Sequence, residues 1–117
     1  MRFLMMYRPD QKEGTPPSPE YVAEMGKHCE EAAKAGVLLM SEGLQPTAKG
    51  ARVRLKGEKF MVTDGPFTEA KDVIAGIAMI QAKSKQEAIE LAKNFIKVGG
   101  EGETEVRQLY EPSDFGS

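Results

Sequence analysis

Apolar and polar residues along this chain follow a pattern that predicts β-strands and two helices. The segments with strand character are Arg2 to Arg8, Val37 to Met40, Ala51 to Lys56, Lys59 to Thr63, Val73 to Ala82 and Glu103 to Tyr110. Between the first two, apolar residues recur at helical spacing from an expected N-cap at Ser18, followed by Pro19, to a stop at Gly36. A second helix is expected to open with the capping-box sequence Ser84 to Glu87. The last residues, Glu111 to Ser117, are expected to form a loose tail.

The two central segments are predicted to form a hairpin. Gly57-Glu58 joins them, and glycine at the first loop position favours a type II′ turn. The register set by this turn pairs Val53 with Val62, Leu55 with Phe60, Arg54 with Met61 and Ala51 with Asp64. The apolar pairs therefore share one face, which Asp64 joins, while Arg52 and Arg54 lie on the other face.

The order of these elements, β-α-β, hairpin, β-α-β, predicts an α+β domain of ferredoxin-like topology with an inserted hairpin. A chain of 117 residues is long enough for one domain, residues 1–117, and too short for two. Two helices cover only one face of such a sheet, yet Phe3 to Tyr7, Val37 to Met40 and Val73 to Ile80 are apolar on both faces. We therefore expect a homodimer packed sheet on sheet; a monomer with an exposed apolar sheet is the costlier alternative.

Composition narrows the functional classes. The net charge is −2 and the charges are interleaved without a lysine-arginine block, so direct nucleic-acid binding is not expected. A single cysteine, Cys29, and a single histidine, His28, leave no internal disulfide and no structural zinc cluster. No segment approaches the roughly 20 apolar residues of a membrane span, and Met1 to Tyr7 is too short for a signal peptide. We expect a cytoplasmic protein that has no membrane span, no structural metal and no cofactor.

One motif carries a family resemblance. Asp64-Gly65-Pro66-Phe67 is followed by Thr68-Glu69-Ala70-Lys71 and an apolar run, and the blocks Ala35 to Leu39, Ser41 to Leu44 and Lys49 to Val53 precede it. Together these blocks resemble the DGPF branch of the YCII-related family, and the resemblance implies a dimeric α/β barrel. It also implies two kinds of function. Some relatives look like small enzymes with a histidine–aspartate pair, including dehalogenating or lyase-like members, whereas DGPF domains also occur fused to, or encoded beside, sigma-factor domains.

Three residues are candidates for acid–base catalysis. Asp64 would act as a general base or proton relay, its pKa raised by the apolar face around it, or it would organise the turn before Pro66. His28 would act with Glu24 or Glu31 of the same helix, or is an ordinary boundary histidine; a His28–carboxylate metal site also stays open. Glu42 would share a cleft with Asp64 at a strand end, or is a solvated loop acid.

Four more residues are candidates for holding a substrate. Arg54 and Arg52 would bind a carboxylate or phosphate, or they protect a hairpin edge from aggregation. Tyr7, at the end of the first strand, would lean over the same cleft or simply pack there. Phe67 completes the set from the DGPF motif.

These residues support a functional hypothesis and a rival. The hypothesis is a cofactor-free small-molecule-binding domain, with a cleft between the sheet, the first helix and the DGPF loop. If it is an enzyme, Asp64 would move a proton in lyase- or isomerase-like chemistry, an expectation that rests on family analogy. The rival is a non-catalytic regulatory partner of a sigma factor in transcription initiation.

Overall fold

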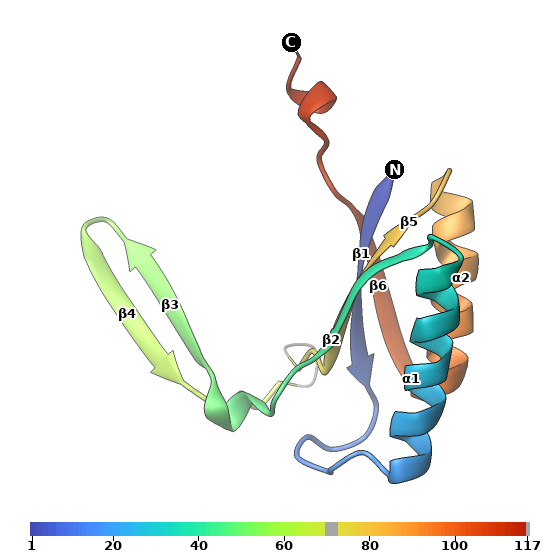
Figure 1. The fold of residues 1–117 in the computed structure, drawn as a ribbon. Helices are drawn as coiled ribbons and strands as arrows, with labels where there is room; N and C mark the ends of the chain where they lie inside the picture. The colour runs from blue at the N-terminus through green and yellow to red at the C-terminus, as the bar shows by residue number, and fades with distance from the viewer. Residues whose placement is uncertain (70–72, 117) are drawn as a thin grey trace.

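The computed structural model describes residues 1–69 and 73–116. Its elements are β1 Arg2–Pro9, α1 Pro19–Lys34, β2 Leu38–Gly43, β3 Ala51–Lys56, β4 Lys59–Asp64, β5 Gly76–Gln81, α2 Lys85–Gly99 and β6 Gly102–Gln108, with the short 3₁₀ helices η1 Thr47–Lys49 and η3 Pro112–Phe115 (Figure 1). Ala70 and Lys71 of the DGPF stretch and Ser117 of the tail lie outside the described residues.

Four strands form an antiparallel sheet in the order β2-β5-β1-β6, and both helices lie on one of its faces (Figure 1). The two β-α-β units interleave their strands in this order, as the ferredoxin-like topology requires. The predicted α+β class and topology, with the hairpin inserted between the two units, are therefore confirmed.

The core lies between the sheet and the helices. Its buried residues are Phe3 and Met5 of β1, Ala78 and Ile80 of β5, and the alanines Ala82, Ala88 and Ala92. The helix starts agree with the sequence, because the Ser18 and Ser84 hydroxyls accept hydrogen bonds from the backbone N–H groups of Tyr21 and Glu87, each at 3.1 Å. The second cap differs in one respect. The Glu87 carboxylate accepts from the N–H of Lys83 at 3.4 Å, so the capping box is not closed on Ser84.

The opposite face of the sheet carries a cluster of apolar side chains that we call the open face. By strand register, its members are Leu4, Met6, Met40, Ile77 and Met79, and all are half-buried. Within the described part of the chain, no helix covers this face (Figure 1). A single chain therefore buries only one face of its sheet, and the expectation of burial on both faces is not met within one copy.

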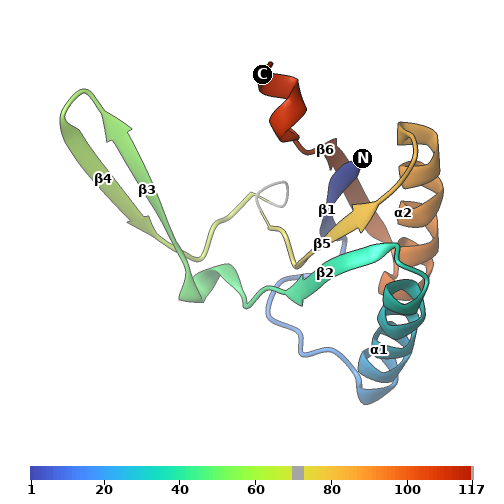
Figure 2. The ribbon, with the colours of Figure 1, turned by 45° about the horizontal axis from the view of Figure 1, so that its top comes forward.

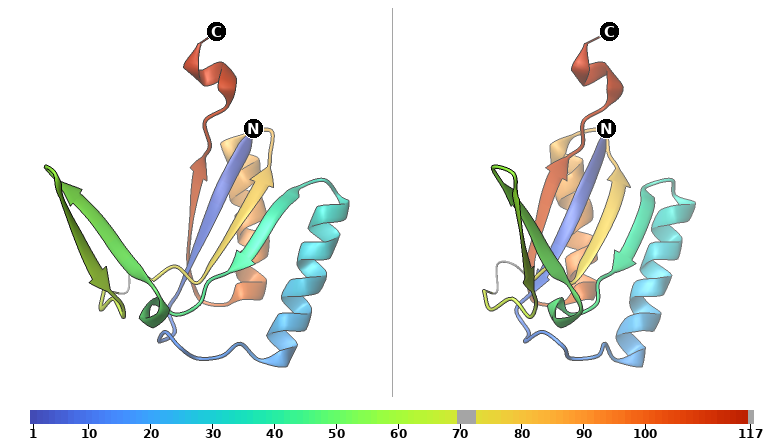
Figure 3. Two further views of the ribbon diagram at one scale, coloured as in Figure 1. Left: turned by 60° about the vertical axis from the view of Figure 1, so that its left-hand side comes forward. Right: turned by 90° about the vertical axis from the view of Figure 1, so that its left-hand side faces the viewer.

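The hairpin of β3 and β4 forms a separate two-stranded ribbon, which we call the arm (residues 51–64). Its register is the predicted one, with Val53 opposite Val62 and Leu55 opposite Phe60. Gly57 has φ +63° at the turn, as the first position of a type II′ turn requires. The arm projects away from the sheet on the side opposite the helices (Figures 2 and 3). Both strands are exposed along their whole length.

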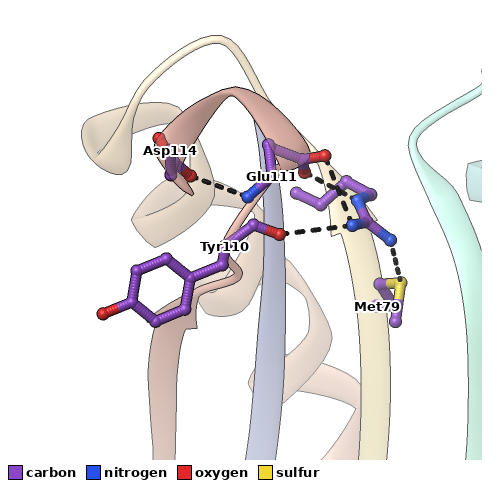
Figure 4. Close-up of polar contacts among 5 residues, drawn as sticks. Met79, Tyr110, Glu111 and Asp114 are labelled. Carbon is purple, nitrogen blue, oxygen red and sulfur yellow. Dashed lines mark hydrogen bonds and ion pairs between the residues drawn. The ribbon is translucent and has the colours of Figure 1, made fainter. Parts of the chain in front are cut away.

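Several predicted element boundaries are wrong. The second strand continues to Gly43 because β5 pairs with it, Glu42 lying opposite Ile77, so Glu42 is a strand residue and not a loop residue. β5 begins only at Gly76 and β6 ends at Gln108. The segment from Glu111 onward is not loose as far as the structure describes it. It forms η3, in which the Asp114 carboxylate accepts from the Glu111 N–H at 2.7 Å, and the Glu111 carboxylate pairs with Arg2 at 2.7 Å (Figure 4).

Candidate functional site

The structure contains a cavity between the sheet and the two helices, with a volume of about 190 Å³. It lies under the N-terminal half of α1 and the C-terminal half of α2, which contribute Tyr21 and Met25, and Phe95 and Ile96. The sheet contributes Met5, Tyr7, Ser41, Ala78 and Thr104, among others. Its wall is mainly apolar, with a few hydroxyl groups, which is the usual character of a small-molecule site.

Tyr7 connects this cavity to the end of α2. Its ring lies 3.6 Å from the position that a Cβ would take on Gly99. Its hydroxyl lies 2.9 Å from the carbonyl oxygen of Gly100, and the carbonyls of Gly99 and Glu101 are also within hydrogen-bond reach, at 3.1 and 3.2 Å. The shortest of these contacts donates the single phenol proton to the carbonyl of Gly100, the C-cap of α2, where carbonyls lack partners within the helix. Burial raises the pKa of Tyr7, and nearby Tyr21 and Asp10 add to the shift.

Tyr21 is the second phenol of the cavity. Burial raises its pKa, with a smaller contribution from Cys29, so the hydroxyl stays protonated at neutral pH. Within residues 1–69 and 73–116 its hydroxyl makes no hydrogen bond, unlike that of Tyr7. Close by, the Cys29 thiol lies 3.7 Å from the Ser41 hydroxyl. Tyr21 therefore retains an unused donor at the cavity.

Of the catalytic candidates, Glu42 and His28 lie near this cavity. Glu42 lines it and is the one charged residue among the described lining residues. By register, however, its side chain belongs to the face of Ile77, which points away from the helices. The His28 ring packs edge-on against Phe95, which lines the cavity, with 4.4 Å between the ring centroids. His28 is therefore part of the contact between the helices and does not itself line the cavity.

Asp64 lies elsewhere. It ends β4 at the base of the arm, on the other side of the sheet from α1 (Figure 1). Its carboxylate is exposed and accepts no hydrogen bond from the described residues. One chain thus does not bring Asp64 and His28 together.

The DGPF loop is held by two residues that the sequence did not suggest. The Glu13 carboxylate accepts from the Thr47 backbone N–H and, at 2.7 Å, from the Thr47 hydroxyl. The same hydroxyl accepts from the N–H of Phe67 at 3.0 Å. Gly65 donates to the carbonyl of Gly50 at 3.0 Å, and a Cβ on Gly65 would lie only 1.7 Å from the Thr47 carbonyl oxygen. Glycine is therefore required in this loop by the close approach of another backbone segment.

The two arginines of the arm lie on the face predicted for them. The Arg52 guanidinium lies 3.8 Å from the centroid of the Phe67 ring, a cation–π contact. Arg54 lies opposite Met61 on an exposed strand. The predicted site residues thus fall into two groups, one at the cavity (Tyr7 and Glu42, with His28 close by) and one at the arm (Asp64, Arg52, Arg54 and Phe67).

Sequence reasoning missed Tyr21 and the Glu13–Thr47 pair. Tyr21 is one of the apolar residues that recur at helical spacing in the first helix, and nothing in this spacing marks a residue that lines a cavity. Glu13 and Thr47 are 34 positions apart in two loops, so no local pattern joins them. Among residues 1–69 and 73–116, no group of three histidine, cysteine or acidic side chains could hold a metal ion. Nor does that part of the chain contain a helix with the length and apolar character to cross a membrane.

Comparison with known proteins identifies relatives of the chain. The model of the YCII-related domain matches residues 1–111. A curated relative, the uncharacterized protein R00369 of Rhizobium meliloti (strain 1021), is 33% identical over 87 residues, which cover 72% of this chain and 70% of the relative.

Proposed function

The chain belongs to the YCII-related domain family, and we propose that it binds a small molecule in the cavity between the sheet and the two helices. The observation that carries this proposal is the unused Tyr21 hydroxyl at a mainly apolar cavity. No buried side-chain N or O atom of the described residues lacks a partner, so the half-buried Tyr21 hydroxyl is open to solvent. A ligand with an acceptor would replace water as the partner of this donor.

The size of the cavity limits the ligand. Ligand pockets commonly measure about 300–1,000 Å³, and a cavity of about 150 Å³ holds one benzene ring. The volume here, about 190 Å³, suits one ring or a short branched chain with a single small polar substituent. Because the lining offers a neutral phenol and no cation, we expect an uncharged ligand with a hydrogen-bond acceptor.

The cavity supports binding more directly than catalysis. The Tyr7 hydroxyl already donates a hydrogen bond to a backbone carbonyl of the protein, and Asp64 lies on the arm, on the far side of the sheet. Acid–base chemistry by Asp64 would therefore need a second copy of the chain to bring the arm to a bound ligand. The lyase- or isomerase-like reaction remains a prediction. Glu42 is the one charged residue among the described lining residues, but its side chain lies on the face of the sheet away from the helices.

We also propose the homodimer expected from the sequence. The open face presents five apolar side chains that one chain leaves half-buried. Packing two open faces together would remove this apolar surface from water at about 25 cal/mol per Å². This arrangement would leave the cavity, on the helix side of each sheet, accessible in both copies.

The binding proposal can be tested with two probes that share a phenyl ring and a two-carbon side chain. Acetophenone carries a carbonyl acceptor, and ethylbenzene lacks it. Ligand-observed NMR should show that both bind weakly and that acetophenone binds roughly two- to tenfold more tightly, the value of one hydrogen bond. Tyr21→Phe should abolish this preference while ethylbenzene binding persists.

A filled cavity provides the control. Ala78 is buried and lines the cavity, so Ala78→Leu should block both probes, whereas Ala23→Leu, the same change at an exposed position of α1, should not. Binding that survives Ala78→Leu in a variant with a wild-type-like amide spectrum would mean that the probes bind elsewhere. The proposal would also be rejected if neither probe binds to the wild-type protein.

A further inference from the structure

The arm exposes apolar side chains that pack against little else in the same chain. Val53, Leu55, Phe60 and Val62 share one of its faces and are 60–72% exposed. Apart from each other, β3 and β4 make at most marginal contact with any other strand or helix. A two-stranded hairpin without a hydrophobic partner is marginally stable in water. The apolar face of the arm therefore requires a surface to cover it.

The shape of the chain shows how far the arm stands away. The radius of gyration is 16.2 Å, whereas a compact domain of this length has about 13 Å. The direction of the arm is also fixed at its base. Thr47 is bonded to Glu13 and to Phe67, and Gly65 is bonded to Gly50. These contacts hold the base to the loop after β1, so the arm is directed outward and not back onto its own sheet (Figure 3).

The charges of the arm and of the rest of the chain are opposite. Residues 51–64 contain four basic residues (Arg52, Arg54, Lys56 and Lys59) and two acidic ones (Glu58 and Asp64). The remainder of the chain contains twelve basic and sixteen acidic residues. A positive arm and a negative body attract each other in the encounter of two identical chains, which favours a second copy over a basic partner or a nucleic acid.

We propose that the arm reaches across to a second copy of this chain and packs its apolar face (Val53, Leu55, Phe60 and Val62) against the body of that copy. By the two-fold symmetry of a homodimer, each body then receives one arm. This contact is separate from the contact between the two open faces, and it rests on the homodimer proposed above. It gives the Glu13–Thr47–Phe67 bonds a role, because they hold the arm in the direction that meets the partner.

Two neighbouring residues provide the test. Phe60 lies on the apolar face of the arm, whereas Met61, also exposed, lies on the other face beside Arg54. The dissociation constant of the wild-type dimer would be measured by sedimentation with Phe60→Ser and Met61→Ser in parallel. We expect Phe60→Ser to raise it about tenfold or more and Met61→Ser to change it less than about threefold.

The experiment gives different results if the proposed arm contact is wrong and if the proposed homodimer is wrong. A monomeric wild type at all concentrations would reject both. A dimer that is weakened by Met6→Ser on the open face but unaffected by Phe60→Ser would keep the homodimer and reject the arm contact.

Cross-linking identifies what the arm touches. In a Cys29→Ser background, a benzophenone maleimide attached at Phe60→Cys would be activated in dimers refolded from ¹⁴N- and ¹⁵N-labelled chains. Cross-links between arm and body peptides of different isotopes are expected. Cross-links within one isotope alone would show that the arm folds onto its own chain and would overturn the proposal.

Discussion

Replacing Gly65 by alanine should release the base of the arm without unfolding the sheet. A Cβ at this position would lie 1.7 Å from the Thr47 carbonyl oxygen, about half an ordinary contact distance, and the obstructing atom belongs to the backbone. The two segments must therefore separate. This separation would break the hydrogen bond from Gly65 to Gly50 and the bond from Phe67 to the Thr47 hydroxyl. At about 0.5–1.5 kcal/mol for each bond, the local structure should lose about 1–3 kcal/mol.

Native-state hydrogen exchange measures this loss at individual amides. A loss of about 1–3 kcal/mol raises the opening constant roughly five- to 150-fold, so the Phe67 amide should exchange faster by that factor in Gly65→Ala. The amides of Met5 and Ile80, in the central strands, should keep their protection because the arm shares no core with them.

Two controls make this prediction specific. Gly26→Ala, in α1 where a Cβ meets no atom within 4 Å, should leave Phe67 unchanged and stabilise the helix by about 0.5–1 kcal/mol. Asp64→Asn should also leave Phe67 unchanged, since the carboxylate accepts no hydrogen bond from the described residues. Equal exchange of the Phe67 amide in Gly65→Ala and wild type would refute the reasoning. A loss in Asp64→Asn would show that Asp64 organises the turn after all.

Two further predictions concern the body of the protein. Tyr7→Phe removes the hydroxyl that donates to the end of α2 and should lower the free energy of unfolding by about 0.5–1.5 kcal/mol in urea titrations; an unchanged midpoint would mean that water replaces this donor at no cost. A hydrogen bond from Arg107, aided by Arg8, keeps the pKa of Glu105 below its ordinary value. The ionised Glu105 side chain therefore stabilises the folded state above the unfolded-state pKa, and this stabilisation is lost as pH falls through the folded-state pKa. Glu105→Gln should accordingly lower the urea midpoint at pH 7 and match the wild type near pH 3. A gap of constant size between pH 7 and pH 3 would count against this ion pair.

Much of the fold was predictable because the turn and the helix starts depend on sequence signals within a few neighbouring residues. Glycine at the first turn position and two apolar pairs were enough to set the register of the arm, and serine before each helix marked its start. Boundaries failed where a distant strand decided them. β2 continues through Glu42 because β5 lies beside it, and that pairing joins residues 35 positions apart in the chain.

The candidate site was harder to predict because it depends on which side of the sheet each residue lies. The sequence placed Asp64 correctly on the apolar face of the hairpin, but it could not show that this face stays exposed within the described residues. Tyr7 and Glu42 are at the ends of the two strands that flank β5, yet strand register directs their side chains to opposite faces. Period-two alternation thus assigns residues to faces without saying what each face meets.

The place where the arm joins the sheet has a consequence for how such chains can change. β2 and β5 are already neighbours at this point, since Gly43 lies opposite Gly76 and the N–H of Leu44 donates to the carbonyl of Ala75 at 2.8 Å. The residue at which the chain leaves the sheet, Leu44, and the residue at which it returns, Ala75, are thus joined by one backbone hydrogen bond. A tight turn would join the same two strands, so the intervening segment can lengthen, shorten or acquire a new surface while the sheet stays closed. New partners could therefore evolve in this insertion without altering the residues that fold the domain.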